Sequence, residues 1–125
     1  MDELKKQNFS GTSKITQSFR LQYYDLVKKT LRERAQIIPC YAGFASAQIA
    51  PNGDIWTCCI RADPIGNLRE NDYDLKKIWF SEKAAKLRKS INNKECWCPL
   101  ANAAYTNMFM DSKSLFNVIK NRLNF

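Results

Sequence analysis

The sequence predicts an α+β fold in which a small β-hairpin is flanked by helices. Asn52-Gly53 stands between two apolar, strand-like runs, and it is the strongest short hairpin signal because a type I′ turn needs positive φ at both central positions. Between Gln17 and Ala35, apolar residues recur at three- and four-residue steps, which is the period of an amphipathic helix. All five cysteines fall at predicted strand ends or turns. The chain is therefore organised around the hairpin and its cysteines.

We divide the 125 residues into a flexible arm, residues 1–16, and a single domain, residues 17–125. The arm is polar and contains the turn-forming run Ser-Gly-Thr-Ser at residues 10–13. The domain begins with a helix over residues 17–35, whose apolar stripe consists of Phe19, Tyr23, Leu26, Val27 and Leu31. Pro39 ends this segment, because the residue before a proline is pushed out of the helical conformation.

The predicted turn sets the register of the hairpin. With Asn52 and Gly53 as a two-residue loop, Ile49 pairs with Trp56. Side chains alternate between faces along a strand, so one face carries Ala47, Ile49, Trp56 and Cys58. The other face carries Gln48, Ala50, Ile55, Thr57 and Cys59. We expect the first, bulkier face to pack in the interior, which directs Cys58 inward and Cys59 away.

Turn residues at positions 63–67 separate the hairpin from a second helical region. Asn71 or Asp72 is expected to cap a short helical turn there, and Ser81 to cap a helix over residues 82–91. The predicted inward stripe consists of Leu75, Ile78, Trp79 and Leu87. A last helix, over residues 111–123, is expected to present on one side Leu115, Phe116, Ile119 and Leu123.

The composition restricts the classes of function. The chain has no histidine, so any metal site must use thiolates, carboxylates or backbone groups, and imidazole-dependent catalysis is excluded. Residues 1–14 lack the apolar stretch of a signal peptide, and no apolar run approaches the roughly 20 residues needed to cross a membrane. We therefore expect a cytoplasmic protein with no membrane partner. In that compartment, five cysteines indicate reduced thiols or thiolate ligands rather than disulfides.

The formal net charge of +8 has two interpretations. Basic surfaces bind the phosphate backbone of nucleic acids, but the Lys and Arg residues are also spread over the solvated faces of the predicted helices. We favour the second interpretation and expect no nucleic-acid partner. A thiolate site would add a further reason for basic residues, because four thiolates around a cubane of core charge +2 leave a net charge of about −2.

Four cysteines form the candidate site: Cys40, Cys58, Cys96 and Cys98. They are far apart in the sequence, but the hairpin and a connecting helix can bring them together. Four thiolates are the ligand set of both a tetrahedral zinc site and a [4Fe–4S] cluster. The Cys-x-Cys spacing of the last pair is less typical of structural zinc than Cys-x₂-Cys. The simplest alternative is that these cysteines act as small buried hydrophobes.

An ordered set of motifs runs from about residue 37 to residue 100. It comprises Cys40-x₁₂-Gly53-x₄-Cys58, the turn Pro51-Asn52-Gly53-Asp54, the double Cys58-Cys59, Pro64-Ile65-Gly66-Asn67-Leu68, Ile78-Trp79 with Ser81, Leu87-Arg88, and the pair Cys96/Cys98. In this combination the segment resembles the SPASM or twitch domain, the cysteine-rich C-terminal extension of many radical S-adenosylmethionine enzymes. The helix before it resembles the linker that follows the catalytic barrel of those enzymes.

The resemblance implies that residues 17–125 are one SPASM/twitch-like domain that binds an auxiliary [4Fe–4S] cluster. Carried over by position, the ligands are Cys40, Cys58, Cys96 and Cys98. Gly53 then makes the hairpin turn without touching the metal, and Cys59 is an alternative ligand. Only two cysteines follow the helix, where a two-cluster domain has a longer run, so a single cluster of the twitch kind is favoured. The implied role is electron transfer or substrate positioning, and the implied partner is a radical S-adenosylmethionine catalytic domain or its peptide or protein substrate.

The chain lacks the Cys-x₃-Cys-x₂-Cys motif that holds the catalytic cluster and S-adenosylmethionine in those enzymes. We therefore predict no catalytic residues and no radical chemistry from this chain alone. Two other functions are open at this point. One is a structural four-cysteine zinc module for interactions with protein or nucleic acid, and the other is a metal-free basic adaptor that docks nucleic acid.

Overall fold

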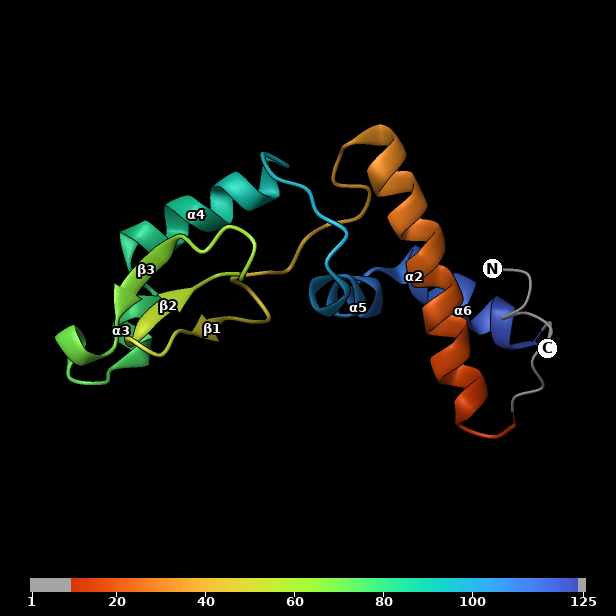
Figure 1. The fold of residues 1–125 in the computed structure, drawn as a ribbon, viewed down its shortest axis with the longest axis horizontal. Coiled ribbons are helices and arrows are strands. Elements are labelled where there is room, and N and C mark those ends of the chain that lie inside the picture. Colours follow the sequence, from red (N-terminus) through yellow and green to blue (C-terminus); the bar gives the residue numbers. More distant parts are fainter. Residues whose placement is uncertain (1–9, 124–125) are drawn as a thin grey trace.

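The structure, a computed structural model, describes residues 10–123 and the side chains of residues 10–121. Its elements are α2 (Ser13–Glu33), β1 (Gln48–Ile49), β2 (Asp54–Trp56), β3 (Pro64–Asn67), the 3-10 helix η1 (Arg69–Asn71), α3 (Leu75–Trp79), α4 (Glu82–Asn92), α5 (Ala101–Met110) and α6 (Ser112–Leu123). Figure 1 shows two halves: a sheet half, made of β1–β3, α3 and α4, and a helical half, made of α2, α5 and α6. Two segments connect them, residues 34–41 (the first crossing) and residues 93–100 (the second crossing).

The sheet half confirms the predicted α+β class. Its antiparallel sheet has the order β1-β2-β3, with β2 in the centre. Helices α3 and α4 pack against β3. The core between them consists of Ile55, Ile65, Ile78 and Ala84, with Leu68, Trp79 and Leu87 packed against it. Strands β2 and β3 and helices α3 and α4 thus contribute apolar side chains to one small interior, as the pattern of Ile78, Trp79 and Leu87 predicted.

The hairpin register differs from the predicted one. Ile49 pairs with Ile55 rather than with Trp56, so the loop is Pro51-Asn52-Gly53, and the N–H of Gly53 donates to the carbonyl of Ala50 at 2.9 Å. Proline favours the second position of a type I turn, and glycine, here at φ +96°, favours the left-handed position that follows in three-residue hairpins. The two-residue turn was wrong because the proline belongs to the turn and not to the strand.

The buried face of the hairpin is also the opposite of the one we expected. Ile55 is fully buried and Thr57 is 1% exposed, whereas Ile49 is 62% exposed. Ile65 of β3, Ile78 of α3 and Ala84 of α4 pack against Ile55 and bury that side of β2. The bulkier set around Trp56 was therefore the wrong choice for the interior.

Strand β3 was read from the sequence as turn residues. Pro64 is its first residue, the position where a missing N–H costs least. Gly66 lies so close to α3 that an added Cβ atom would sit 2.8 Å from Cγ2 of Ile78. The glycine in this segment therefore allows the close packing of α3 on the strand.

The helical half is a three-helix arrangement in which α2, α5 and α6 pack on one another. Its core consists of Leu26, Ala104 and Met108, with Phe19, Tyr23, Ile37 and Ile38 packed against it. Helix α5 was not predicted at all, because its sequence ANAAYTNMFM carries no charged residue and no clear apolar stripe. None of the described helices has the length and apolar composition needed to span a bilayer.

Several helix details correct the predictions. Helix α2 begins at Ser13 rather than at Gln17, and residues 1–9 of the predicted arm lie outside the described residues. The cap of α3 is Asp74, which accepts from the N–H of Lys77 at 3.1 Å, because the expected cap residues at 71 and 72 belong to η1 and its end. Ser81 caps α4 as predicted and accepts from the N–H of Ala84 at 3.2 Å.

Four side chains that we placed in apolar stripes are exposed: Leu31, Leu75, Phe116 and Ile119. On α6 the buried side chains are instead Ser114 and Val118, because that face meets α2 and α5. The side chain of Leu123 lies outside the described residues. The helical half therefore buries a narrower stripe than its sequence suggested.

Candidate metal centre

The four candidate cysteines meet between the two halves. Cys40 lies on the first crossing, Cys58 lies two residues after the end of β2, and Cys96 and Cys98 lie on the second crossing. All four line one cavity of about 60 Å³, which has room for several small atoms because a water molecule needs about 10–15 Å³. Cys59 is not among the residues that line it. The structure thus brings together the four predicted residues and leaves their neighbour outside.

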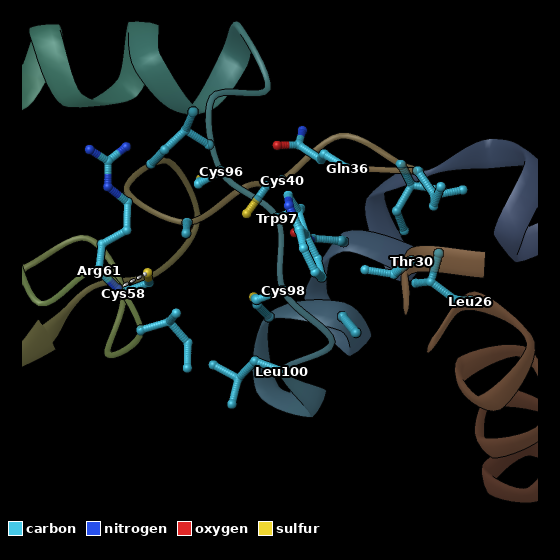
Figure 2. A pocket seen from close by; sticks show the side chains of 18 residues that line it. Leu26, Thr30, Gln36, Cys40, Cys58, Arg61, Cys96, Trp97, Cys98 and Leu100 are labelled. Atoms are coloured by element: carbon cyan, nitrogen blue, oxygen red, sulfur yellow. Dashed lines mark hydrogen bonds between the residues drawn. The ribbon is translucent and has the colours of Figure 1, made fainter. Parts of the chain in front are cut away.

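The thiols surround this space rather than meet at a point. All five cysteines are free and of intermediate burial. In Figure 2, the sulfur atoms of Cys40 and Cys58 point into the same space, and Cys96 and Cys98 lie around it. Within the described residues, no three Cys, Asp or Glu side chains lie close enough to hold a single metal ion. The centre is therefore a ring of thiols around a gap.

The backbone of each crossing is held in place by side chains that the sequence analysis did not select. The side-chain amide of Gln36 is oriented so that both its oxygen and its nitrogen form hydrogen bonds. The oxygen accepts from the N–H of Cys40 at 3.0 Å. Its nitrogen donates to the carbonyls of Ile91, at 3.2 Å, and Cys96, at 3.3 Å. One side chain therefore connects the two crossings and the end of α4 beside two of the cysteines.

The helical half is attached to both crossings in a similar way. The hydroxyl of Tyr23 on α2 donates to the carbonyl of Pro99 at 2.9 Å. The amide oxygen of Asn107, a buried residue of α5, accepts from the N–H of Tyr41 at 2.8 Å. These long-range bonds fix the backbone next to Cys98 and Cys40 against the helices.

A turn after β2 places Cys58 and a cation at the cavity. The N–H of Arg61 donates to Sγ of Cys58 at 3.4 Å, a contact that stabilises negative charge on a sulfur ligand. The Arg61 guanidinium pairs through Nε with Asp63 at 2.9 Å and donates to Ser90 on α4 at 2.8 Å. Burial lowers the pKa of Arg61, but the contacts with Asp63 and Cys96 outweigh this effect and raise the pKa overall. A positive charge is thus fixed at the edge of the thiol ring.

Burial is the largest cause of the raised pKa of the Cys96 and Cys98 thiols. Arg61 opposes the rise at Cys96, and the backbone at Leu100 opposes it at Cys98. The charges of Cys40 and Cys58 raise both values further. Four thiolates this close repel one another, so a bound cation is needed to hold them in the charged form together.

Arg88, from the Leu87-Arg88 motif, has a supporting position. Its guanidinium donates to the carbonyls of Gly43 and Trp79 and lies 4.5 Å from the centre of the Trp79 ring. It joins the loop after Cys40 to α4. The motif therefore holds the sheet half against the first crossing, and Arg88 does not line the cavity.

Residues 40–99 match the family model of SPASM, an iron–sulfur cluster-binding domain. The segment is a SPASM domain. This confirms the resemblance that the motifs suggested, and its bounds contain all four cysteines that line the cavity. No curated protein and no solved structure matches the chain. The family implies that the domain binds an iron–sulfur cluster.

The SPASM cavity fits an iron–sulfur group in its chemistry. Thiolates are the usual ligands of such clusters, and this cavity is lined by four thiols and a fixed cation. The remaining wall is largely apolar, with residues such as Leu26, Ile38 and Leu100, which limits the access of water. Sequence spacing identified the thiols, but nothing in it pointed to Gln36 or Arg61, whose contacts arise only after the chain has folded.

Proposed function

We propose that this chain binds one [4Fe–4S] cluster through Cys40, Cys58, Cys96 and Cys98, as a single-cluster SPASM domain of the twitch kind. The observation that carries the proposal is that the four thiols, which all belong to the matched residues 40–99, line one cavity. Cysteine thiolates in a set of four are the ligands of [4Fe–4S] clusters. When bound, such a cluster supplies one-electron transfer.

The arrangement favours a cluster over a zinc ion. In a zinc site each sulfur lies about 2.3 Å from the metal, so the four sulfurs lie within about 4 Å of one another. In this chain the described cysteines surround a gap and are not grouped closely enough for one ion. The family match also favours an iron–sulfur cluster over a zinc ion.

The residues around the four thiols favour a negatively charged cluster and hold the two crossings in place. Arg61 offers an N–H to the Cys58 sulfur and a guanidinium beside Cys96, and both favour negative charge on the sulfurs. Gln36 holds the crossings at a fixed separation. The net charge of +8 on the chain offsets the charge of about −2 on a four-thiolate cluster.

We further propose that the cluster serves a radical S-adenosylmethionine enzyme in the cytoplasm, by electron transfer or by positioning a substrate. The supporting arguments are the SPASM match and the resemblance of this segment to the C-terminal extension of such enzymes. Since the chain contains no Cys-x₃-Cys-x₂-Cys motif, a separate catalytic domain has to supply that site. The partner is then this catalytic domain or its peptide or protein substrate. No membrane partner is part of the proposal.

Anaerobic reconstitution tests the cluster directly. The chain is incubated with iron and sulfide without air, desalted, and analysed for metals. We expect about four iron and four sulfide per chain and a broad absorbance band at about 400 nm. One zinc per chain, with no bound iron or sulfide after the same treatment, would contradict the proposal and identify a structural zinc module instead.

A further inference from the structure

A second hollow lies on the helical half, between α2 and α6, with a volume of about 830 Å³. We call it the basic groove. Figure 1 shows the two helices that form its walls packed on each other. Its basic lining residues are Lys28, Lys29, Arg32, Lys113 and Lys120, and its acidic ones are Asp25 and Asp111. The groove is therefore positively charged.

Both helices present cations to the groove. Lys28 and Arg32 are one turn apart on α2, and Lys113 and Lys120 are two turns apart on α6. All are exposed. Within the described residues, the ion pairs are formed by other side chains: Arg61 with Asp63, and Lys86 with Glu82. The positive charge of the groove is thus not neutralised by the protein itself.

The carboxylates of the groove compensate little of this charge. The Asp111 carboxylate already forms a hydrogen bond at the start of α6, where it accepts from the N–H of Ser114 at 2.8 Å. The floor is apolar and includes Leu26, Ile37 and Ile38. A ligand that fits this surface combines carboxylates for the rim with at least one apolar side chain for the floor.

We propose that the basic groove docks an acidic peptide segment of a protein partner. The charge of +8 on the whole chain attracts such a segment from a distance. A nucleic acid fits less well, because single-stranded nucleic acids are held by aromatic platforms and the lining of the groove contains no aromatic residue.

The basic groove lies next to the cysteine cavity of the SPASM domain. Leu26, Ile37 and Ile38 line both the groove and the cysteine cavity. A peptide in the groove therefore lies one layer of side chains from the thiols. The inference goes beyond cluster binding, and since no cysteine lines the groove, its test does not depend on whether the chain loads iron.

The test measures binding of a short fluorescein-labelled peptide made of glutamates and leucines, by fluorescence anisotropy with the full chain. The variant K28E/K120E reverses two groove charges on opposite walls. The control variant K76E/K77E makes the same change in net charge on exposed lysines of α3, in the other half. We expect the groove variant to bind about tenfold more weakly, because two attractive contacts with the glutamates of the peptide become like-charge repulsions. The control should change the affinity less than about twofold.

Three outcomes would overturn the proposal. The first is the lack of saturable binding by the unmodified chain. The second is an equal loss in both variants, which would show only general charge attraction. The third is tighter binding of a labelled oligothymidylate with the same sensitivity to K28E/K120E, which would make the groove a nucleic-acid site. Circular dichroism of both variants confirms that each is folded before binding is compared.

Discussion

The two halves of this molecule are stabilised in different ways. The sheet half has a compact core in which Ile55 and Ala84 are fully buried, and both of its α-helices begin with a side-chain cap. The helical half also has a fully buried residue, Met108. Asp111 caps α6 by accepting from the N–H of Ser114, but α2 and α5 begin without a side-chain cap. Side-chain caps thus begin both α-helices of the sheet half, whereas α2 and α5 of the helical half depend more on tertiary packing.

Neither half contains the complete set of cysteines. Cys58 extends from the sheet half, and the other three lie on the crossings that lead to the helices. Among the described elements, extensive packing occurs within each half. A cluster held by all four cysteines would therefore act as a cross-link between two bodies that otherwise depend on a few hydrogen bonds.

The largest expected effect comes from the cysteine that the sheet half contributes. Cys58→Ser removes the thiol that lines the cavity, and we expect most of the bound iron to be lost after anaerobic reconstitution. Cys59→Ser changes the next residue, which does not line the cavity, and should keep its iron. The two variants are compared by their bound iron per chain and by their absorbance at about 400 nm. Equal iron loss in the two variants would contradict the assignment of Cys58 as the ligand.

The second prediction concerns the core of the helical half. Met108→Ala should lower the free energy of unfolding by about 2–5 kcal/mol, because the side chain is fully buried. Met110→Ala, on the same helix but 52% exposed, should change it by less than about 0.5 kcal/mol. Urea unfolding followed by circular dichroism measures both values.

The same variant tests whether the halves are coupled by metal. The three tryptophans lie at positions 56, 79 and 97, outside α2, α5 and α6. In metal-free Met108→Ala protein, the helical signal should therefore fall at a lower urea concentration than the tryptophan fluorescence. In reconstituted protein, the two transitions should come together. Coincident transitions without metal would show that the hydrogen bonds of the crossings already couple the halves.

The comparison also explains what the sequence could predict. Ser81 was predicted because a helix cap depends on residue type and position, and it caps α4. The four cysteines were selected by residue type and spacing and line one cavity, and their role as cluster ligands stays a prediction. The hairpin was located correctly, but its register was wrong, because the decision between two loop lengths rests on Pro51 alone. Helix α5 was missed because its stability comes from α2 and α6 rather than from an amphipathic pattern.

The smallest expected effect compares the helix caps of the two halves. Ser81→Ala should destabilise the sheet half by about 1 kcal/mol, because the Ser81 hydroxyl accepts from the N–H of Ala84 at the start of α4. Thr12→Ala makes a similar change at the start of α2, where the side chain forms no cap bond, and should have an effect below about 0.5 kcal/mol. Urea midpoints from tryptophan fluorescence and circular dichroism give the two values. Equal losses would mean that the Thr12 side chain caps α2 as Ser81 caps α4, and would contradict the contrast between these two helix starts.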